Sequence, residues 1–335
     1  MKRIAIVKLS AMGDIIHAMS ALQFIKKHNK DLIIDWFVEQ AFSKVLQDNP
    51  DINNIYEINL KAIKKDKKEI FNQVKLIKEY SKNNYDLVID TQGLIKSALV
   101  SFFLAKNRAG FCKKSTREGI ASIFYTDKIS IDYDKNVIDR NCFLLSNALK
   151  FSISKEDILN KEAFLFYKDE DKTIYEYLKK DKKNILLVVG ASWDSKMYSK
   201  EKFAKIVTSF DENFIIAWGN DKEREVAEFI SKNSNAKTLP KIDLNSLKAL
   251  ISKVDLVIGN DTGPTHMAWA LNIPSITIFG NTPAYRNTYT TKINKTIKSE
   301  NEVNPLKLDK NDFSIKNIDE KKIVEMAKEL LCIEK

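Results

Sequence analysis

The stretch "IVKLSAMGDIIHAM", residues 6–19, decides the fold of the first half of the chain. An apolar run typical of a buried strand ends in small residues and Gly13, and an amphipathic helical pattern follows directly. Asp14 lies where that helix would begin. The stretch therefore predicts a strand, turn and helix of a parallel α/β sheet, with Asp14 either as a helix cap or as a base facing a substrate.

The same alternation of short apolar runs and helical patterns continues along the chain and occurs twice. Strands are predicted over 3–8, 32–38, 86–90, 107–111, 184–189, 213–218, 255–258 and 275–279. Helices are predicted over 15–28, 64–82, 94–104, 200–209, 222–231, 244–252 and 264–271. A charged, weakly patterned region near 150–183 separates the two sets. We expect domains over 1–160 and 161–317, then a C-terminal helix over 318–335.

Composition places the chain among globular proteins. Its 335 residues are 44% hydrophobic and 30% charged, and no apolar run reaches the roughly 20 residues of a membrane span. The three cysteines are isolated and match neither a disulfide framework nor a zinc site. The N-terminal apolar run fits a strand better than a signal peptide, so we expect a cytoplasmic protein.

The net charge of +10 is concentrated in the first half. Residues 1–150 hold 25 Lys and Arg against 17 Asp and Glu, whereas the remainder holds 30 against 28. A solvated lysine-rich surface explains this, and so does a partner with negative charge. The sequence has no helix-turn-helix, zinc or RNP pattern, and its second half is nearly neutral, which argues against nucleic acid.

In the second half, "VIGNDTGPTHMAWAL" at 257–271 is the densest candidate site. A buried strand ends at Gly259, and Pro264 suits the first turn of a following helix. Such a helix start binds anions, so Asp261, Thr262, Gly263 and His266 are candidate ligand-binding residues. In the alternative interpretation, Asp261 or Thr262 only caps the helix and His266 packs.

Two further strand ends in this half carry candidate residues. In "VVGASWDSKMYSKEKF" (188–203), Ser192 and Lys196 follow a strand, and the lysine could neutralise a diphosphate leaving group. In "IIAWGNDKEREVA" (215–227), Glu223 could accept ribose hydroxyls. A solvated lysine and a carboxylate interacting with a helix N-terminus are the alternatives.

The first half offers basic residues after its strands. "VIDTQGLIKSAL" (88–99) contains Gln92, Gly93 and Lys96, and "KKSTREGIASIFYT" (113–126) contains Arg117. Arginine suits bidentate recognition of carboxylate or phosphate. The stretch 60–80 is basic and amphipathic, which fits either a solvated helix or an anionic membrane surface.

Together these segments resemble the bacterial lipopolysaccharide heptosyltransferases. The matching pieces are "KLSAMGDIIHAMSAL", "VIDTQGLIKSA", "STREGIASIFY", "WGNDKERE" and "GNDTGPTHMAWAL", in family order over nearly the whole chain. The resemblance implies an α/β GT-B fold, in which two Rossmann-like domains face each other across a central cleft.

The resemblance also implies an inverting, metal-independent glycosyltransferase without a cofactor. The second domain would bind ADP-L-glycero-β-D-manno-heptose, and the first would bind Kdo-lipid A on the cytoplasmic face of the anionic inner membrane. "QGLIKSA" and "STREGIASIFY" favour Kdo over heptose as the acceptor. A heptose acceptor, a non-catalytic sugar-nucleotide binder and a nucleic-acid-binding protein are the alternatives.

Site roles follow from the resemblance position by position. Asp14 matches the catalytic base, although its position alone favours a helix cap. The donor-binding residues would be Ser192, Lys196, Glu223, Asp261, Thr262, Gly263 and His266. The acceptor-binding residues would be Gly13, Lys61, Lys64, Gln92, Gly93, Lys96 and Arg117, with Lys65 as a companion. The chain departs from the family pattern at Ala191 and Ser192, where relatives have two threonines, and in the loop "GNTPAYRN".

Overall fold

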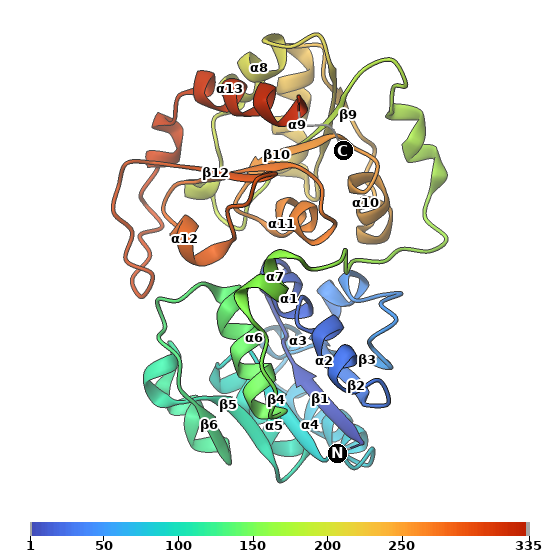
Figure 1. Ribbon diagram of the computed structural model, residues 1–335, viewed down its shortest axis with the longest axis vertical. Coiled ribbons are helices and arrows are strands. Elements are labelled where there is room, and N and C mark those ends of the chain that lie inside the picture. Colours follow the sequence, from blue (N-terminus) through green and yellow to red (C-terminus); the bar gives the residue numbers. More distant parts are fainter. Residues whose placement is uncertain (1, 333–335) are drawn as a thin grey trace. The chain divides into compact units, whose positions relative to one another are not determined.

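The structure is a computed structural model that describes residues 2–332. The chain divides into two compact units, Met1–Phe164 and Leu165–Lys335, each built around its own sheet (Figure 1). The division follows Phe164, whereas the sequence places the boundary after residue 160. The units are described separately below.

Unit 1 contains six parallel strands in the order β3-β2-β1-β4-β5-β6. The strands are β1 (Arg3–Val7), β2 (Ile33–Glu39), β3 (Asn54–Ile58), β4 (Leu87–Asp90), β5 (Arg108–Phe111) and β6 (Asp127–Ile129). β1 lies at the centre, where Ile6 pairs with Trp36 on one side and Ile89 on the other. Strands buried on both faces need an almost continuous apolar run, and the "IAIV" of β1 supplies it.

Helices cover both faces of this sheet. They are α1 (Met12–Met19), α2 (Leu22–His28), α3 (Ala62–Lys65), α4 (Glu69–Ser81), α5 (Ile95–Leu104), α6 (Val137–Ala148) and α7 (Lys155–Leu159). The chain crosses from β1 towards β3 and then returns to β4. Right-handed crossovers therefore put α1 and α2 on one face, and α4 and α5 on the other. The packing agrees, because α1 contacts α6 and α4 contacts α5.

Unit 2 repeats the arrangement with the order β12-β11-β10-β7-β8-β9. Its strands are β7 (Asn184–Val188), β8 (Asn213–Ala217), β9 (Lys237–Thr238), β10 (Leu256–Asn260), β11 (Ser275–Phe279) and β12 (Asn294–Lys298). Its helices are α8 (Lys200–Thr208), α9 (Asp221–Lys232), α10 (Leu244–Ile251), α11 (Gly263–Ala270), α12 (Ala284–Asn287) and α13 (Glu320–Leu331).

The last helix, α13, belongs to the core of unit 2. Asp319 is its N-cap and accepts a hydrogen bond from the Lys321 N–H at 2.9 Å. Ile323, Ala327 and Leu330 repeat at helical spacing and are buried against the central strands.

The prediction of two α/β halves with parallel sheets is confirmed, and all eight predicted strands are present. Four edge strands are missed, because they are short or only partly buried and carry polar residues, as in the "NKTIK" of β12. The predicted helix 15–28 is wrong as one element, since the chain turns at Ser20 and Ala21. The Ser20 hydroxyl bonds the His17 carbonyl there at 2.7 Å.

The predicted helix 64–82 is likewise divided into α3 and α4. The Asp66 carboxylate accepts a hydrogen bond from the Lys68 N–H at 2.9 Å, and this turn ends one helix and starts the next. Within residues 2–332, no helix is both long and apolar enough to cross a bilayer.

Candidate functional site

In each unit the strand order reverses between two central strands, and ligands of open α/β sheets bind beyond the carboxyl ends at such a point. In unit 1 the two strands are β1 and β4, and in unit 2 they are β7 and β10. Asp14 follows β1, Gln92 follows β4, Lys196 follows β7 and Asp261 follows β10. The predicted residues therefore gather at the expected edge of each sheet.

Asp14 caps α1 and still has a free oxygen. Its Oδ2 accepts a hydrogen bond from the Ala11 N–H at 3.2 Å, so the cap interpretation is observed. The side chain is half-buried, and Oδ1 has no hydrogen-bond partner in the described part of the chain. Gly13 lies beside it in the first turn of α1. The carboxylate can therefore hold the helix start with one oxygen and meet a ligand with the other.

Gln92 joins the loops that follow β1 and β4. Its Oε1 accepts hydrogen bonds from the N–H groups of Leu9 at 2.7 Å and Ser10 at 3.3 Å. The Lys96 ammonium donates to the Ser10 hydroxyl at 3.3 Å from the start of α5. The amide oxygen of Gln92 is thus occupied by backbone, whereas Lys96 is exposed at the same place.

Gly93 and Arg117 lie at the turn between β4 and α5. Gly93 has a φ of +68°, and a Cβ there would come within 2.7 Å of the Thr116 hydroxyl, which donates to the Gly93 carbonyl. Glu118 accepts a hydrogen bond from the Ile95 N–H at 2.8 Å. Both neighbours of Arg117 thus bond the start of α5 and the turn before it, and Arg117 itself is exposed.

Glu39 was missed by the sequence reasoning. It ends β2 and is buried, and burial raises the pKa of its carboxyl while the charges of Lys96 and Lys61 oppose that rise. Lys61 lies over the Phe42 ring at 5.2 Å, and Lys65 is exposed on α3. The side chain of predicted Lys64 lies outside the described residues. An acidic residue at the end of an apolar run was the available signal for Glu39.

In unit 2, Asp261 is the centre of a buried polar cluster. One carboxylate oxygen pairs with the Lys196 ammonium at 2.6 Å, and the other lies 3.0 Å from His266 Nε2. Thr282 and Asn287 donate to the same oxygen as Lys196, at 2.7 and 3.2 Å. Asp261, Lys196 and His266 are each at least nine-tenths buried.

The electrostatics of this cluster are set by its charges. Burial alone would raise the pKa of Asp261, but Lys196 and the hydrogen bond to His266 more than offset it and hold the pKa well below its usual range. The aspartate therefore stays ionised, and the buried lysine keeps its counter-charge. A compact cation fixed beside a helix start is the arrangement that binds a phosphate group.

The remaining donor-side candidates surround this cluster. Thr262 is the N-cap residue of α11 and makes no side-chain cap bond, and Gly263 begins the helix. Ser192 is exposed on the loop after β7. The neighbouring Trp193 ring has Lys196 at 5.2 Å and Lys310 at 5.1 Å from its centroid. Two cations and an aromatic ring thus lie together beyond β7.

Glu223 caps the turn between β8 and α9. Its carboxylate accepts hydrogen bonds from the Gly219 N–H at 2.8 Å and the Asn220 amide at 2.7 Å. A Cβ on Gly190 would lie only 2.2 Å from the Glu223 Cδ, so glycine at the end of β7 makes room for this carboxylate. The carboxylate is half-buried and reachable at the strand ends.

The sequence reasoning also missed the buried amides that fix the donor-side loops. Asn260 donates to the Val189 carbonyl at 2.8 Å and accepts from the Tyr198 N–H at 3.0 Å. Asn281 donates to the Ser195 hydroxyl at 2.8 Å and the Asp309 carbonyl at 2.7 Å. Their only sequence signal is position, since Asn260 is the last residue of β10 and Asn281 comes two residues after β11.

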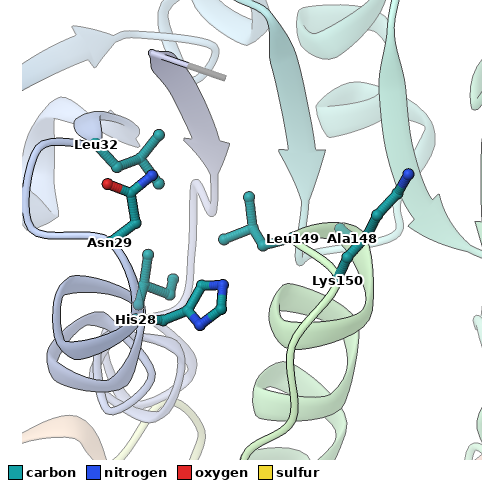
Figure 2. Close-up of a pocket in the computed structure, with 7 residues that line it drawn as sticks. His28, Asn29, Leu32, Ala148, Leu149 and Lys150 are labelled. Atoms are coloured by element: carbon teal, nitrogen blue, oxygen red, sulfur yellow. The ribbon is translucent and has the colours of Figure 1, made fainter.

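A cavity of about 250 Å³ in unit 1 lies apart from these residues. Figure 2 shows the His28 ring and the Leu149 side chain directed toward each other between the ends of α2 and α6. Since α2 ends just before β2 begins, this cavity is at the amino-terminal edge of the sheet. None of the predicted site residues lines it. Over residues 2–332, no group of three or more His, Cys, Asp or Glu is placed to hold a metal ion.

Comparison with known proteins identifies the family. Residues 73–314 match the model of glycosyltransferase family 9 (heptosyltransferase). The chain is 43% identical to lipopolysaccharide heptosyltransferase 1 of Campylobacter coli, over 98% of both chains. It is 27% identical to lipopolysaccharide heptosyltransferase 1 of Escherichia coli K12, over 84% of this chain and 88% of that one.

Solved structures show the same fold. E. coli heptosyltransferase WaaC with ADP-2-deoxy-2-fluoro heptose superposes with a TM-score of 0.78 at 21% identity, over 98% of this chain and 99% of that chain. A family 9 glycosyl transferase from Veillonella parvula gives 0.80 at 17% identity, over 98% and 97%. The chain therefore belongs to glycosyltransferase family 9, the heptosyltransferases, and is a glycosyltransferase.

Proposed function

We propose that this protein transfers heptose from ADP-L-glycero-β-D-manno-heptose to Kdo of Kdo-lipid A, in assembly of the lipopolysaccharide inner core. The observation that carries the proposal is Asp14, a carboxylate with one free oxygen in the first turn of α1, after a loop whose Ser10 hydroxyl bonds the Lys96 ammonium. The relative from C. coli, named lipopolysaccharide heptosyltransferase 1, supports the choice of reaction.

Asp14 acts as the general base in this proposal. Its free oxygen takes the proton of the Kdo hydroxyl as that hydroxyl attacks the anomeric carbon of heptose, while ADP leaves. A single displacement inverts the anomeric configuration. Lys96 and Arg117 bind the carboxylates and phosphates of the acceptor.

The leaving group is stabilised by unit 2. Negative charge develops on ADP in the transition state, and Lys196 with the start of α11 at Thr262 and Gly263 offers a fixed positive site for it. Asp261 holds Lys196 in place, and Glu223 accepts the adenosine ribose hydroxyls. Because Lys196 and the start of α11 take up the charge of the leaving group in this proposal, it includes no metal ion.

The test is transfer from ADP-heptose to detergent-dispersed Kdo2-lipid A. Asp14→Asn keeps the size and the capping ability but cannot take a proton, so we expect about 10²–10⁴-fold slower transfer. Asp157→Asn is a matched control, because Asp157 is also a capping residue three positions into a helix and accepts from the Ser154 N–H at 2.9 Å.

The outcomes distinguish a catalytic base from a helix cap as the role of Asp14. Activity of Asp14→Asn equal to that of Asp157→Asn would leave Asp14 as a helix cap only. No transfer by the unmodified protein would contradict the Kdo acceptor, and transfer to a heptosylated acceptor would then assign a heptose acceptor.

A lipid-anchored acceptor requires the protein to work at a membrane surface. We propose that it is cytoplasmic and works peripherally at the anionic inner membrane, with unit 1 towards the lipid. The excess of basic residues in the first 150 positions supports this orientation.

A further inference from the structure

An exposed apolar strip runs along α5. Ile95, Leu99 and Phe102 are 40%, 39% and 47% exposed, and their spacing of four and three residues puts them on one face of the helix. The opposite face carries Val100 and Leu104, which are buried in the core of unit 1. The core of unit 1 is therefore filled by the opposite face of α5, and the strip leaves a large part of each of its three side chains exposed.

The short helix η3 (Gly119–Phe124) extends the strip sideways. Ile120 and Ile123 are 58% and 66% exposed, and residues three apart in a 3₁₀-helix lie one above the other. η3 packs along α5, where Ala98 and Ala121 share a small core and the Phe102 and Phe124 rings lie 5.8 Å apart. We name the five residues Ile95, Leu99, Phe102, Ile120 and Ile123 the apolar ridge.

The chain segment that carries the apolar ridge is basic, and we call its exposed lysines and arginines the basic border. The segment 95–128 holds seven lysines and arginines against two carboxylates. The exposed ones are Lys96, Lys106, Lys113, Lys114, Arg117 and Lys128. Contiguous exposed aliphatic side chains mark an interaction surface, and a basic border selects a partner with negative charge.

The ridge begins at the acceptor-side residues. Ile95 precedes Lys96, whose ammonium bonds Ser10, and the Ile95 N–H is held by Glu118, which follows Arg117. An amphipathic ligand whose polar end reaches Asp14 would therefore have its apolar part near the ridge.

We infer that the apolar ridge with its basic border docks the protein on an anionic lipid bilayer. The aliphatic side chains enter the interface between headgroups and acyl chains, and the lysines pair with lipid phosphates. This rests on the proposed function, because a lipid-anchored acceptor keeps its acyl chains in the bilayer while its sugar reaches Asp14. A second copy of the chain is disfavoured, since a two-fold contact would bring two basic borders together.

The first experiment measures flotation with vesicles that lack the acceptor. Vesicles of phosphatidylcholine with phosphatidylglycerol are compared with phosphatidylcholine alone. The double variant Ile120→Ser/Ile123→Ser should bind anionic vesicles about tenfold more weakly, because two inserted side chains lose their burial. Leu306→Ser is the control, an equally exposed leucine in unit 2 that should bind like the unmodified protein.

A second variant tests the border. Lys113→Gln/Lys114→Gln should lose about tenfold or more in affinity for the anionic vesicles and show a weaker salt dependence, since each lysine at the surface contributes to binding. Neither lysine is bonded to Asp14, which is the proposed base, or to Asp261 and His266 of the donor-side cluster.

Activity separates this inference from the proposed function. With detergent-dispersed Kdo2-lipid A, both variants should transfer heptose at the unmodified rate, and only transfer to vesicle-embedded acceptor should fall. Unchanged vesicle binding of both variants would overturn the docking surface. A dimer of the unmodified protein that Ile120→Ser/Ile123→Ser dissociates would overturn it in favour of a second copy. Ridge-dependent binding without any transfer would overturn only the proposed function.

Discussion

Asp261 and Lys196 form a buried ion pair whose removal is costly. Two charges taken out of water are stable only when each is compensated, and the carboxylate has Lys196, His266, Thr282 and Asn287 around it. The pair orients the lysine but leaves its other N–H groups for a phosphate. Its main contribution is thus the position of the cation.

Asp261→Asn should lower the free energy of unfolding by about 3–5 kcal/mol, because it leaves Lys196 as an uncompensated buried charge. Asp194→Asn is the matched control. Asp194 pairs with Lys222 at the same 2.6 Å, but both side chains are more than half exposed, so removal should cost about 0–1 kcal/mol. Denaturant unfolding of both variants measures the difference, and equal losses would contradict this account.

For single residues, the sequence shows which residue types follow each strand but not which of their side chains contact one another. The motif around Asp261 and His266 is local, so it could be predicted. Thr282 and Asn287 bind the same carboxylate from 21 and 26 positions further along. Their proximity depends on β11 lying beside β10, which is a property of the folded sheet.

Among the elements, the ends of β7 and β8 lie close together because Gly190, at the end of β7, has no side chain. The Glu223 carboxylate occupies the space where a Cβ of Gly190 would lie. The same carboxylate holds the turn at Gly219, so its position is fixed by two strand ends at once.

Gly190→Ala should displace the Glu223 carboxylate and weaken ADP binding about tenfold, by loss of a charge-assisted hydrogen bond to the ribose. The cost in folding stability should be small, because the contacted atoms end a flexible side chain. At Gly219 a Cβ would meet Glu223 Oε2 at an ordinary 3.4 Å, so Gly219→Ala should bind ADP normally. Calorimetric titration with ADP measures both, and equal affinities would show that Glu223 does not contact the nucleotide.

Central elements could be predicted and peripheral ones could not, for one reason. β1 and β10 are buried on both faces, so burial demands apolar runs that are visible in the sequence. β3 has only one buried residue, Ile58, and "NIYEI" therefore has no clear strand pattern. Its pairing comes from backbone hydrogen bonds to β2.

For the whole molecule, Lys161 makes stability depend on pH. Its side chain is 6% exposed, and burial lowers its pKa from 10.5 to about 7, against the opposing charge of Glu162. Between pH 7 and 10.5 the unfolded chain keeps the proton that the folded chain has lost. The free energy of unfolding therefore rises with pH across this window, by up to about 1.4 kcal/mol per pH unit.

Lys161→Met removes this dependence. The variant should be more stable than the unmodified protein at pH 6.5, where the folded chain buries a charged ammonium, and the difference should shrink by pH 9.5, where the folded chain buries a neutral amine. Lys155→Met, an exposed change on α7, serves as the control. Chemical unfolding at the two pH values is the measurement, and a difference that stays constant would refute the role of Lys161.

The two sheets share one topology, 3-2-1-4-5-6 within each unit, yet they carry opposite charges at equivalent positions. In unit 1 the helix after the first strand carries an aspartate, Asp14, in its first turn, and the helix after the fourth carries Lys96. In unit 2 the loop after the first strand carries Lys196, and the loop after the fourth carries Asp261. The same scaffold is thus used twice with the order of the two charges exchanged, and under the proposed function one copy would supply a proton acceptor and the other an anion receptor.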